Sequence, residues 1–168
     1  MKEKQVIKPR LYLETTIPSY LTAWASRDII VNAHQQITPF WWKERKNDFD
    51  IYISQFVLDE ASSGDADAAK RRIEIIKAFP KLEILNEVTE LSNQILSSGL
   101  IPKKEATDVA HIAIAAVHKI DFLMTWNCRH LANTITSEKI STICKALGFD
   151  CPVICTPETL MGDERDDY

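Results

Sequence analysis

Four residues with oxygen-bearing side chains stand where apolar runs end or helical segments begin: Glu14, Glu60, Asp108 and Asn127. Mg²⁺ and Mn²⁺ prefer oxygen ligands and are commonly bound through carboxylates. Carboxylates held close together repel one another unless a cation lies between them. A bound divalent ion can activate water and hold a phosphate for cleavage. These residue types therefore indicate an acidic metal site suited to phosphodiester hydrolysis, provided that the fold brings them together.

Spacing alone leaves plainer interpretations open for the same residues. Glu60, on a short helix, is typical of a solvated surface charge, and Asp108 can simply stabilise the start of its helix. Glu14 fits a surface position less well because apolar strand residues precede it. His111 lies one turn after Asp108 and can hydrogen-bond a carboxylate, although a structural histidine is the commoner case.

Short apolar runs alternate with longer segments of helical periodicity, which predicts an α/β fold with a parallel sheet of about five strands, covered on both faces. Ligands of such sheets bind beyond the carboxyl ends of the strands. Thr125 and Asn127 should emerge there, after an apolar run typical of a buried parallel strand. The expected strands are 7–13, 51–53, 82–85, 121–126 and 152–155, and the expected helices are 28–47, 54–61, 66–78, 88–98, 106–118 and 136–147.

The segment 28–47 carries apolar residues at helical spacing. Pro39 lies inside it and is expected to kink or divide the helix, because proline removes a backbone hydrogen bond. The neighbouring pair Trp41 and Trp42 is interpreted as a packing anchor rather than a base-stacking platform.

The totals of the 168-residue chain predict one soluble domain over 1–160, followed by an acidic tail over 161–168. The net charge of −4 argues against a broadly basic nucleic-acid surface, though not against a local one. No apolar run is long enough to span a membrane, and the charged start of the chain does not resemble a signal peptide. A cytoplasmic protein is therefore expected. The four cysteines form no C-x-x-C pair and are expected to be free thiols.

The order and wording of four segments resemble the PIN-domain family, which includes the VapC-like toxins of toxin–antitoxin modules. The segments are LYLETT at 11–16, IS…LDE at 53–60, TDVAHIAIA at 107–115 and FLMTWN at 122–127. The resemblance extends over 11–155, nearly the whole predicted domain.

This resemblance implies a three-layer α/β/α PIN-like fold and Mg²⁺- or Mn²⁺-dependent ribonuclease activity. It implies RNA as the substrate, a paired antitoxin as a protein partner, and homodimers, which are also the commonest default assembly. The implied catalytic residues are Glu14, Glu60, Asp108 and Asn127, of which the three acids would bind the metal. Thr16, Thr125 and His111 are expected to support them.

Two positions depart from the family pattern. Glu14 stands where Asp is usual, which moves the carboxylate one methylene further from the backbone. Asn127 stands where Asp is common, so it can coordinate through its carbonyl oxygen but adds no charge. The alternative function is therefore a PIN-fold RNA- or protein-binding module with weak or lost catalysis.

Basic residues flank two of the motifs. Arg129 and His130 follow Asn127, and Lys103 and Lys104 precede Asp108. These four are candidates for contacts with RNA phosphates, with a solvated turn as the alternative. Other acid-lined α/β folds fit worse, because no Asp nucleophile ends the first strand and no glycine-rich phosphate loop is present.

Overall fold

The computed structural model describes residues 7–162, and its centre is a five-stranded sheet whose strands are all paired in parallel. The strand order is β3-β2-β1-β4-β5. The predicted parallel sheet of about five strands is therefore confirmed. The strands are β1 (Arg10–Leu13), β2 (Asp50–Ser54), β3 (Lys81–Leu82), β4 (Phe122–Met124) and β5 (Val153–Cys155).

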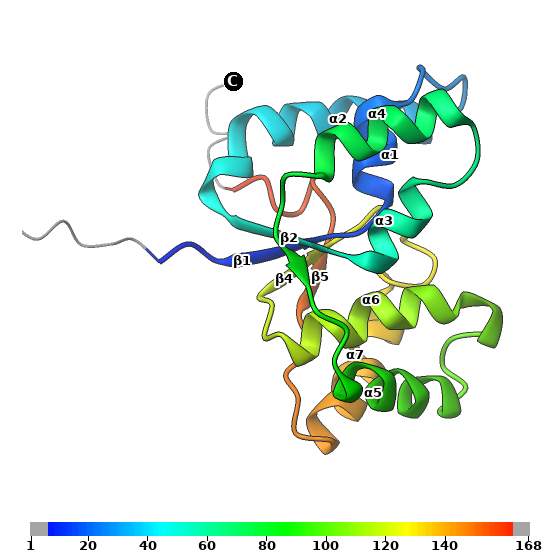
Figure 1. Cartoon of the computed structure of the whole chain (residues 1–168), viewed down its shortest axis with the longest axis vertical. Coiled ribbons are helices and arrows are strands. Elements are labelled where there is room, and N and C mark those ends of the chain that lie inside the picture. Colours follow the sequence, from blue (N-terminus) through cyan, green and yellow to red (C-terminus); the bar gives the residue numbers. More distant parts are fainter. Residues whose placement is uncertain (1–6, 163–168) are drawn as a thin grey trace, which may run out of the picture.

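Helices cover both faces of this sheet and complete the predicted three-layer α/β/α arrangement (Figure 1). α1 packs against α2 and α4 on one face, and α5 packs against α6 and α7 on the other. Short 3₁₀ turns precede β2 and α6. The helices are α1 (Thr16–Thr22), α2 (Ile29–Arg45), α3 (Gln55–Ala61), α4 (Ala66–Ile76), α5 (Asn86–Ser97), α6 (Ala106–Val117) and α7 (Thr134–Ala146), and the turns are η1 (Lys46–Asp48) and η2 (Lys103–Glu105).

The strand order reverses between β1 and β4, which are adjacent although the chain visits β2 and β3 between them. Leu11 pairs with Phe122 and Leu13 with Met124, so both strands end at the same level. The Glu14 amide also donates to the Met124 carbonyl over 3.1 Å. Open parallel sheets bind ligands at such a switch point, beyond the carboxyl ends of the strands.

α6 is the most buried helix and lies directly under the sheet (Figure 1). Its residues from Ile112 to Ala116 are almost inaccessible to solvent, as expected for a helix that is apolar around most of its circumference. Trp41 anchors the opposite layer: its side chain is fully buried, and its Nε1–H donates to the Leu160 carbonyl over 3.0 Å. This agrees with the interpretation of Trp41 as a packing anchor.

Two sequence expectations need correction. Pro39 does not divide its helix, because α2 continues through it; Pro39 is exposed, and Asp28 caps the helix start by accepting the Val31 amide over 2.9 Å. The third strand shrinks to Lys81–Leu82, since β3 is a sheet edge with one neighbour. Not all apolar residues of α2 are buried, since Ile29 and Ile30 are 85% and 68% exposed.

Among the described residues no helix has the length and apolar character needed to cross a bilayer. The terminal segments 1–6 and 163–168, including most of the predicted acidic tail, lie outside the described residues.

Candidate active site

Glu14 is a nearly buried carboxylate at the exit of β1, only 4% exposed. Its Oε2 atom accepts three hydrogen bonds: from the Thr16 amide at 3.0 Å, the Thr16 hydroxyl at 2.5 Å and the Thr125 hydroxyl at 2.7 Å. A buried carboxylate is costly unless such donors compensate its lost hydration. No described residue donates a hydrogen bond to Oε1. This atom is also not among the described side-chain atoms that lack both a partner and access to solvent. Oε1 is therefore the side of Glu14 that is available to a ligand.

The same two threonine hydroxyls fix the chain that follows β4. Thr16 Oγ1 accepts the Trp126 amide at 2.8 Å, and Thr125 Oγ1 accepts the Asn127 amide at 2.9 Å. Each hydroxyl thus donates to Glu14 and accepts from the backbone. Thr16 and Thr125 were predicted as supporting residues, and in the structure they hold Glu14 in place.

Glu60 projects from α3, which matches the expected helix 54–61 and has Ser54 as its N-cap. Its Oε1 accepts the Thr15 hydroxyl at 2.8 Å and faces His111 Nε2 at 2.6 Å. Burial raises the pKa of this carboxyl, but the hydrogen bond and charge of His111, together with the Thr15 bond, outweigh burial, so the net pKa lies below its ordinary value. Glu60 is therefore ionised at neutral pH.

His111 belongs to a buried chain of hydrogen bonds. Its Nδ1 lies 2.6 Å from the Tyr12 hydroxyl, which lies 2.7 Å from the Ser54 hydroxyl. Burial raises the pKa of Tyr12 well above its ordinary value, so this phenol keeps its proton. His111 Nε2–H donates to Glu60, while Nδ1 and the Tyr12 and Ser54 hydroxyls bond to one another in sequence. Through this chain of hydrogen bonds His111 orients Glu60.

Tyr12→Phe is expected to destabilise the protein by about 1–3 kcal/mol, because it leaves the buried His111 Nδ1 without a partner. Urea unfolding followed by circular dichroism measures the change. Tyr52→Phe is the matched control, since Tyr52 is half-buried and no described residue hydrogen-bonds its hydroxyl. Equal stability losses in the two variants would contradict the proposed chain of hydrogen bonds.

Asp108 and Asn127 form a second pair beside Glu14. Asn127 Nδ2 donates to Asp108 Oδ2 at 2.9 Å, while Asn127 Oδ1 accepts the His130 amide at 3.2 Å. Burial raises the pKa of Asp108, and the nearby charge of Glu14 raises it further. Sequence reasoning assigned the Asn127 carbonyl oxygen to metal coordination. That oxygen accepts the His130 amide here, and the amide nitrogen faces Asp108.

The structure brings Glu14, Glu60 and His111 closest together, with one potential ligand atom from each inside a 4.8 Å group. Asp108, predicted as the third metal ligand, is outside that group. It accepts from Asn127, whose backbone amide donates to the Thr125 hydroxyl that holds Glu14. Both His111 nitrogens are already bonded, so we interpret His111 as a support for Glu60. Among the described residues each of the three carboxylates is anchored through one oxygen only, leaving Glu14 Oε1, Glu60 Oε2 and Asp108 Oδ1 without a partner.

This donor set fits a hard divalent cation, because it offers carboxylate oxygens and negative charge in one place. No family model matches the chain, and no curated protein matches it by sequence. The chain is, however, similar to a chain in the crystal structure of VapBC2 from Rickettsia felis bound to a DNA fragment from their promoter. The TM-score is 0.55 at 16% identity, covering 87% of this chain and 97% of that one.

The fold is PIN-like. The likeness concerns the fold alone, since the identity is low. Glu14, Glu60 and Asp108 together form the acidic cluster. It lies near the carboxyl ends of β1 and β4, where this PIN-like sheet reverses its strand order.

Asp108→Asn is expected to stabilise the metal-free protein at pH 7. A carboxyl whose pKa is raised in the folded state costs stability as pH rises through that pKa, and the cost is absent below the ordinary Asp pKa of about 3.9. The variant should therefore melt at a higher temperature than wild type in EDTA at pH 7, and the difference should vanish in acid. Thermal melts at both pH values measure it. A lower melting temperature at pH 7 would contradict the expectation.

The predicted RNA-contact residues lie on two neighbouring segments of the PIN-like fold. Lys103 and Lys104 are exposed in η2, and Arg129 is exposed in the loop after β4. His130 Nε2 lies 3.9 Å from Glu105 Oε1, which places the two segments side by side. Their contact with RNA remains a prediction.

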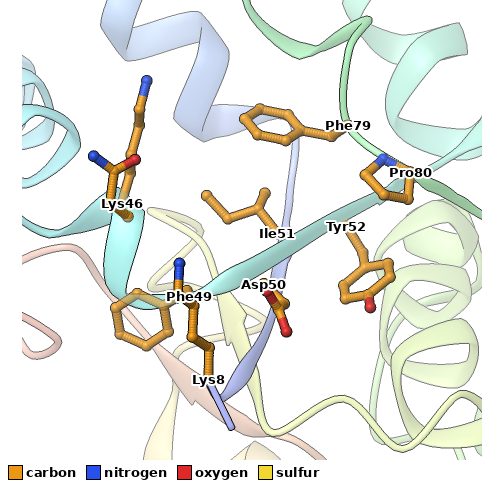
Figure 2. A pocket seen from close by; sticks show the side chains of 9 residues that line it. Lys8, Lys46, Phe49, Asp50, Ile51, Tyr52, Phe79 and Pro80 are labelled. Carbon is orange, nitrogen blue, oxygen red and sulfur yellow. The ribbon is translucent and has the colours of Figure 1, made fainter. Parts of the chain in front are cut away.

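A separate pocket lies at the amino ends of β1, β2 and β3, opposite the acidic cluster (Figure 2). Lys8 and Lys46 stand on one side of it and Phe79 and Pro80 on the other. Asp50 is its one carboxylate. None of the predicted site residues lines this pocket, and its lysines make it unsuitable for a cation.

The sequence did not reveal the residues that hold Glu60 through hydrogen bonds, either directly or through His111. Thr15 holds Glu60, and Tyr12 with Ser54 completes the chain behind His111. The one available signal was the polar hydroxyl of Tyr12 inside an otherwise apolar strand, which must find a partner when buried.

Proposed function

We propose that this protein is a metal-dependent endoribonuclease of the PIN type. One observation carries the proposal: three carboxylates at the switch point of the sheet are each anchored through one oxygen while the other oxygen is left free. Glu14, Glu60 and Asp108 would hold Mg²⁺ or Mn²⁺. When bound, such an ion neutralises phosphate charge and activates water.

The protein's own residues would act by position and charge. Thr16 and Thr125 keep Glu14 fixed, and His111 keeps Glu60 ionised and oriented. Orienting groups of this kind typically change metal affinity or activity by about 10- to 100-fold. Asn127 holds Asp108 through its amide nitrogen, which supports a positioning role in addition to its predicted role in catalysis.

The alternative is a PIN-fold module that binds RNA or protein without turnover. It is favoured by Asn127, whose carbonyl oxygen is engaged by the His130 amide and which adds no charge. Metal binding without RNA cleavage would support this alternative.

The decisive experiment is a calorimetric titration of EDTA-treated protein with Mn²⁺, followed by incubation with labelled single-stranded RNA in Mg²⁺ or Mn²⁺. We expect millimolar or tighter binding and internal cleavage that EDTA abolishes. Absence of metal binding would overturn the nuclease proposal.

We also propose that the chain belongs to a toxin–antitoxin module, forms a homodimer and is held by an antitoxin protein. One structural neighbour is a chain of a VapBC2 crystal structure. Exposed apolar side chains on and before α2, namely Trp24, Ile29, Ile30 and Phe40, offer a surface for a protein partner. Light scattering of the purified chain, alone and co-expressed with the product of the neighbouring gene, measures both assemblies. A monomer in both samples would contradict them.

A further inference from the structure

Three rings gather beside the acidic cluster: Tyr20 on α1, His34 on α2 and Trp126 after β4. His34 stacks on Trp126 with 3.9 Å between ring centroids and 10° between planes. The Tyr20 ring lies 6.1 Å from His34 and 6.3 Å from Trp126. Segments far apart in the sequence thus build one aromatic cluster.

Trp126 connects this aromatic cluster to the carboxylates. Its backbone amide donates to Thr16 Oγ1, the same hydroxyl that donates to Glu14. Its indole Nε1–H donates to Thr38 Oγ1 at 2.8 Å, and Trp126 is only 6% exposed. The Trp126 side chain is therefore held in place, and the His34 ring stacks against it.

Tyr20 and His34 are different, because both remain partly exposed and no described residue hydrogen-bonds their side chains. Burial raises the pKa of Tyr20, and negative charge at the nearby Cys128, Glu14 and Asp28 adds to the shift. Both rings contact Trp126, whose backbone amide shares the Thr16 hydroxyl with Glu14. Two accessible rings lie beside the site at which a phosphate would be held.

We propose that Tyr20 and His34 form a stacking site for one unpaired nucleobase of single-stranded RNA, next to the phosphate at the acidic cluster. The inference rests on the proposed ribonuclease function and adds a base-binding subsite to it. An uncharged base is compatible with acidic surroundings that would repel a second phosphate. Aromatic rings bind bases of any sequence, because every base has a π-face.

The test compares a fluorescein-labelled uridine decamer with the same decamer whose central nucleotides are abasic. Fluorescence anisotropy in Ca²⁺ buffer gives both dissociation constants, and electrophoresis checks that the RNA stays intact. Wild type should bind the base-bearing RNA about 10-fold more tightly. Tyr20→Ala and His34→Ala should each remove most of this preference and leave abasic binding unchanged.

Conservative and distant variants separate stacking from general structural damage. Tyr20→Phe and His34→Phe keep a ring and should stay within about two-fold of wild type, since stacking does not need the polar atoms. Tyr52→Ala, which removes an aromatic ring at the opposite end of the sheet (Figure 2), should also leave the preference intact.

Four results would overturn the inference. The first is that wild type binds both decamers equally, a result that is independent of any variant. If RNA is still cleaved in that case, the nuclease proposal stands and only the stacking site fails. The second is that the alanine variants weaken the binding of both decamers to the same extent. The third is that the alanine variants abolish binding of a protein partner and leave RNA binding unchanged. If wild type neither binds nor cleaves RNA, the inference and the proposed function fail together.

Discussion

Glu14→Gln is expected to abolish Mn²⁺ binding and to lower RNA cleavage by more than about 100-fold, since loss of a group that merely orients a metal ligand already costs about 10- to 100-fold. Gln can turn its carbonyl oxygen to the three donors from Thr16 and Thr125 and so keep the fold. Its amide nitrogen would then face the ligand side, where it can offer neither charge nor a lone pair. Calorimetry and a gel-based cleavage assay measure the two effects.

Glu90→Gln is the matched control for this substitution. Glu90 is exposed on α5 and makes no side-chain hydrogen bond to a described residue. The same chemical change there should leave metal binding and cleavage unaltered. Unchanged Mn²⁺ affinity in Glu14→Gln would place the metal elsewhere, and equal losses in both variants would indicate a general charge effect.

Trp41→Ala should lower the free energy of unfolding by about 3–5 kcal/mol, the usual cost of emptying a buried tryptophan site. The side chain is fully buried, its ring lies 5.7 Å from that of Phe49, and its indole N–H bond to Leu160 would be lost as well. Urea unfolding followed by circular dichroism measures the change.

Trp24→Ala provides the comparison, because Trp24 is 85% exposed. An exposed substitution of this kind usually changes stability by no more than about 0.5 kcal/mol. A loss similar to that of Trp41→Ala would show that Trp24 is buried in solution, for example in an oligomer.

Glu14 and Asn127, the two residues that depart from the PIN family pattern, are each held by hydrogen bonds to neighbouring site residues. Thr16 and Thr125 donate to the same oxygen of Glu14, so the longer side chain is held at a defined position. Asn127 donates to Asp108, a bond that an ionised aspartate could not make. In the metal-free protein this amide therefore relieves repulsion among the acids that a second aspartate would increase.

Much of the architecture follows from local sequence pattern. Continuous apolar runs predicted the parallel strands, and helical periodicity predicted the helices 54–61 and 106–118, which correspond to α3 and α6. These features depend on residues close together in the chain. The sequence also identified Glu14, Glu60, Asp108 and Asn127 as the polar groups at strand exits and helix starts.

Only the tertiary structure decided how those groups are arranged. Strand pairing places Thr125 on Glu14, although 111 residues separate them in the chain, and packing of α6 against β1 sets His111 between Tyr12 and Glu60. The position of α6 also leaves Asp108 outside the closest group, and the approach of α2 to the segment after β4 stacks His34 on Trp126. Such contacts depend on side-chain directions across strands and layers, which local spacing along one strand or helix does not define.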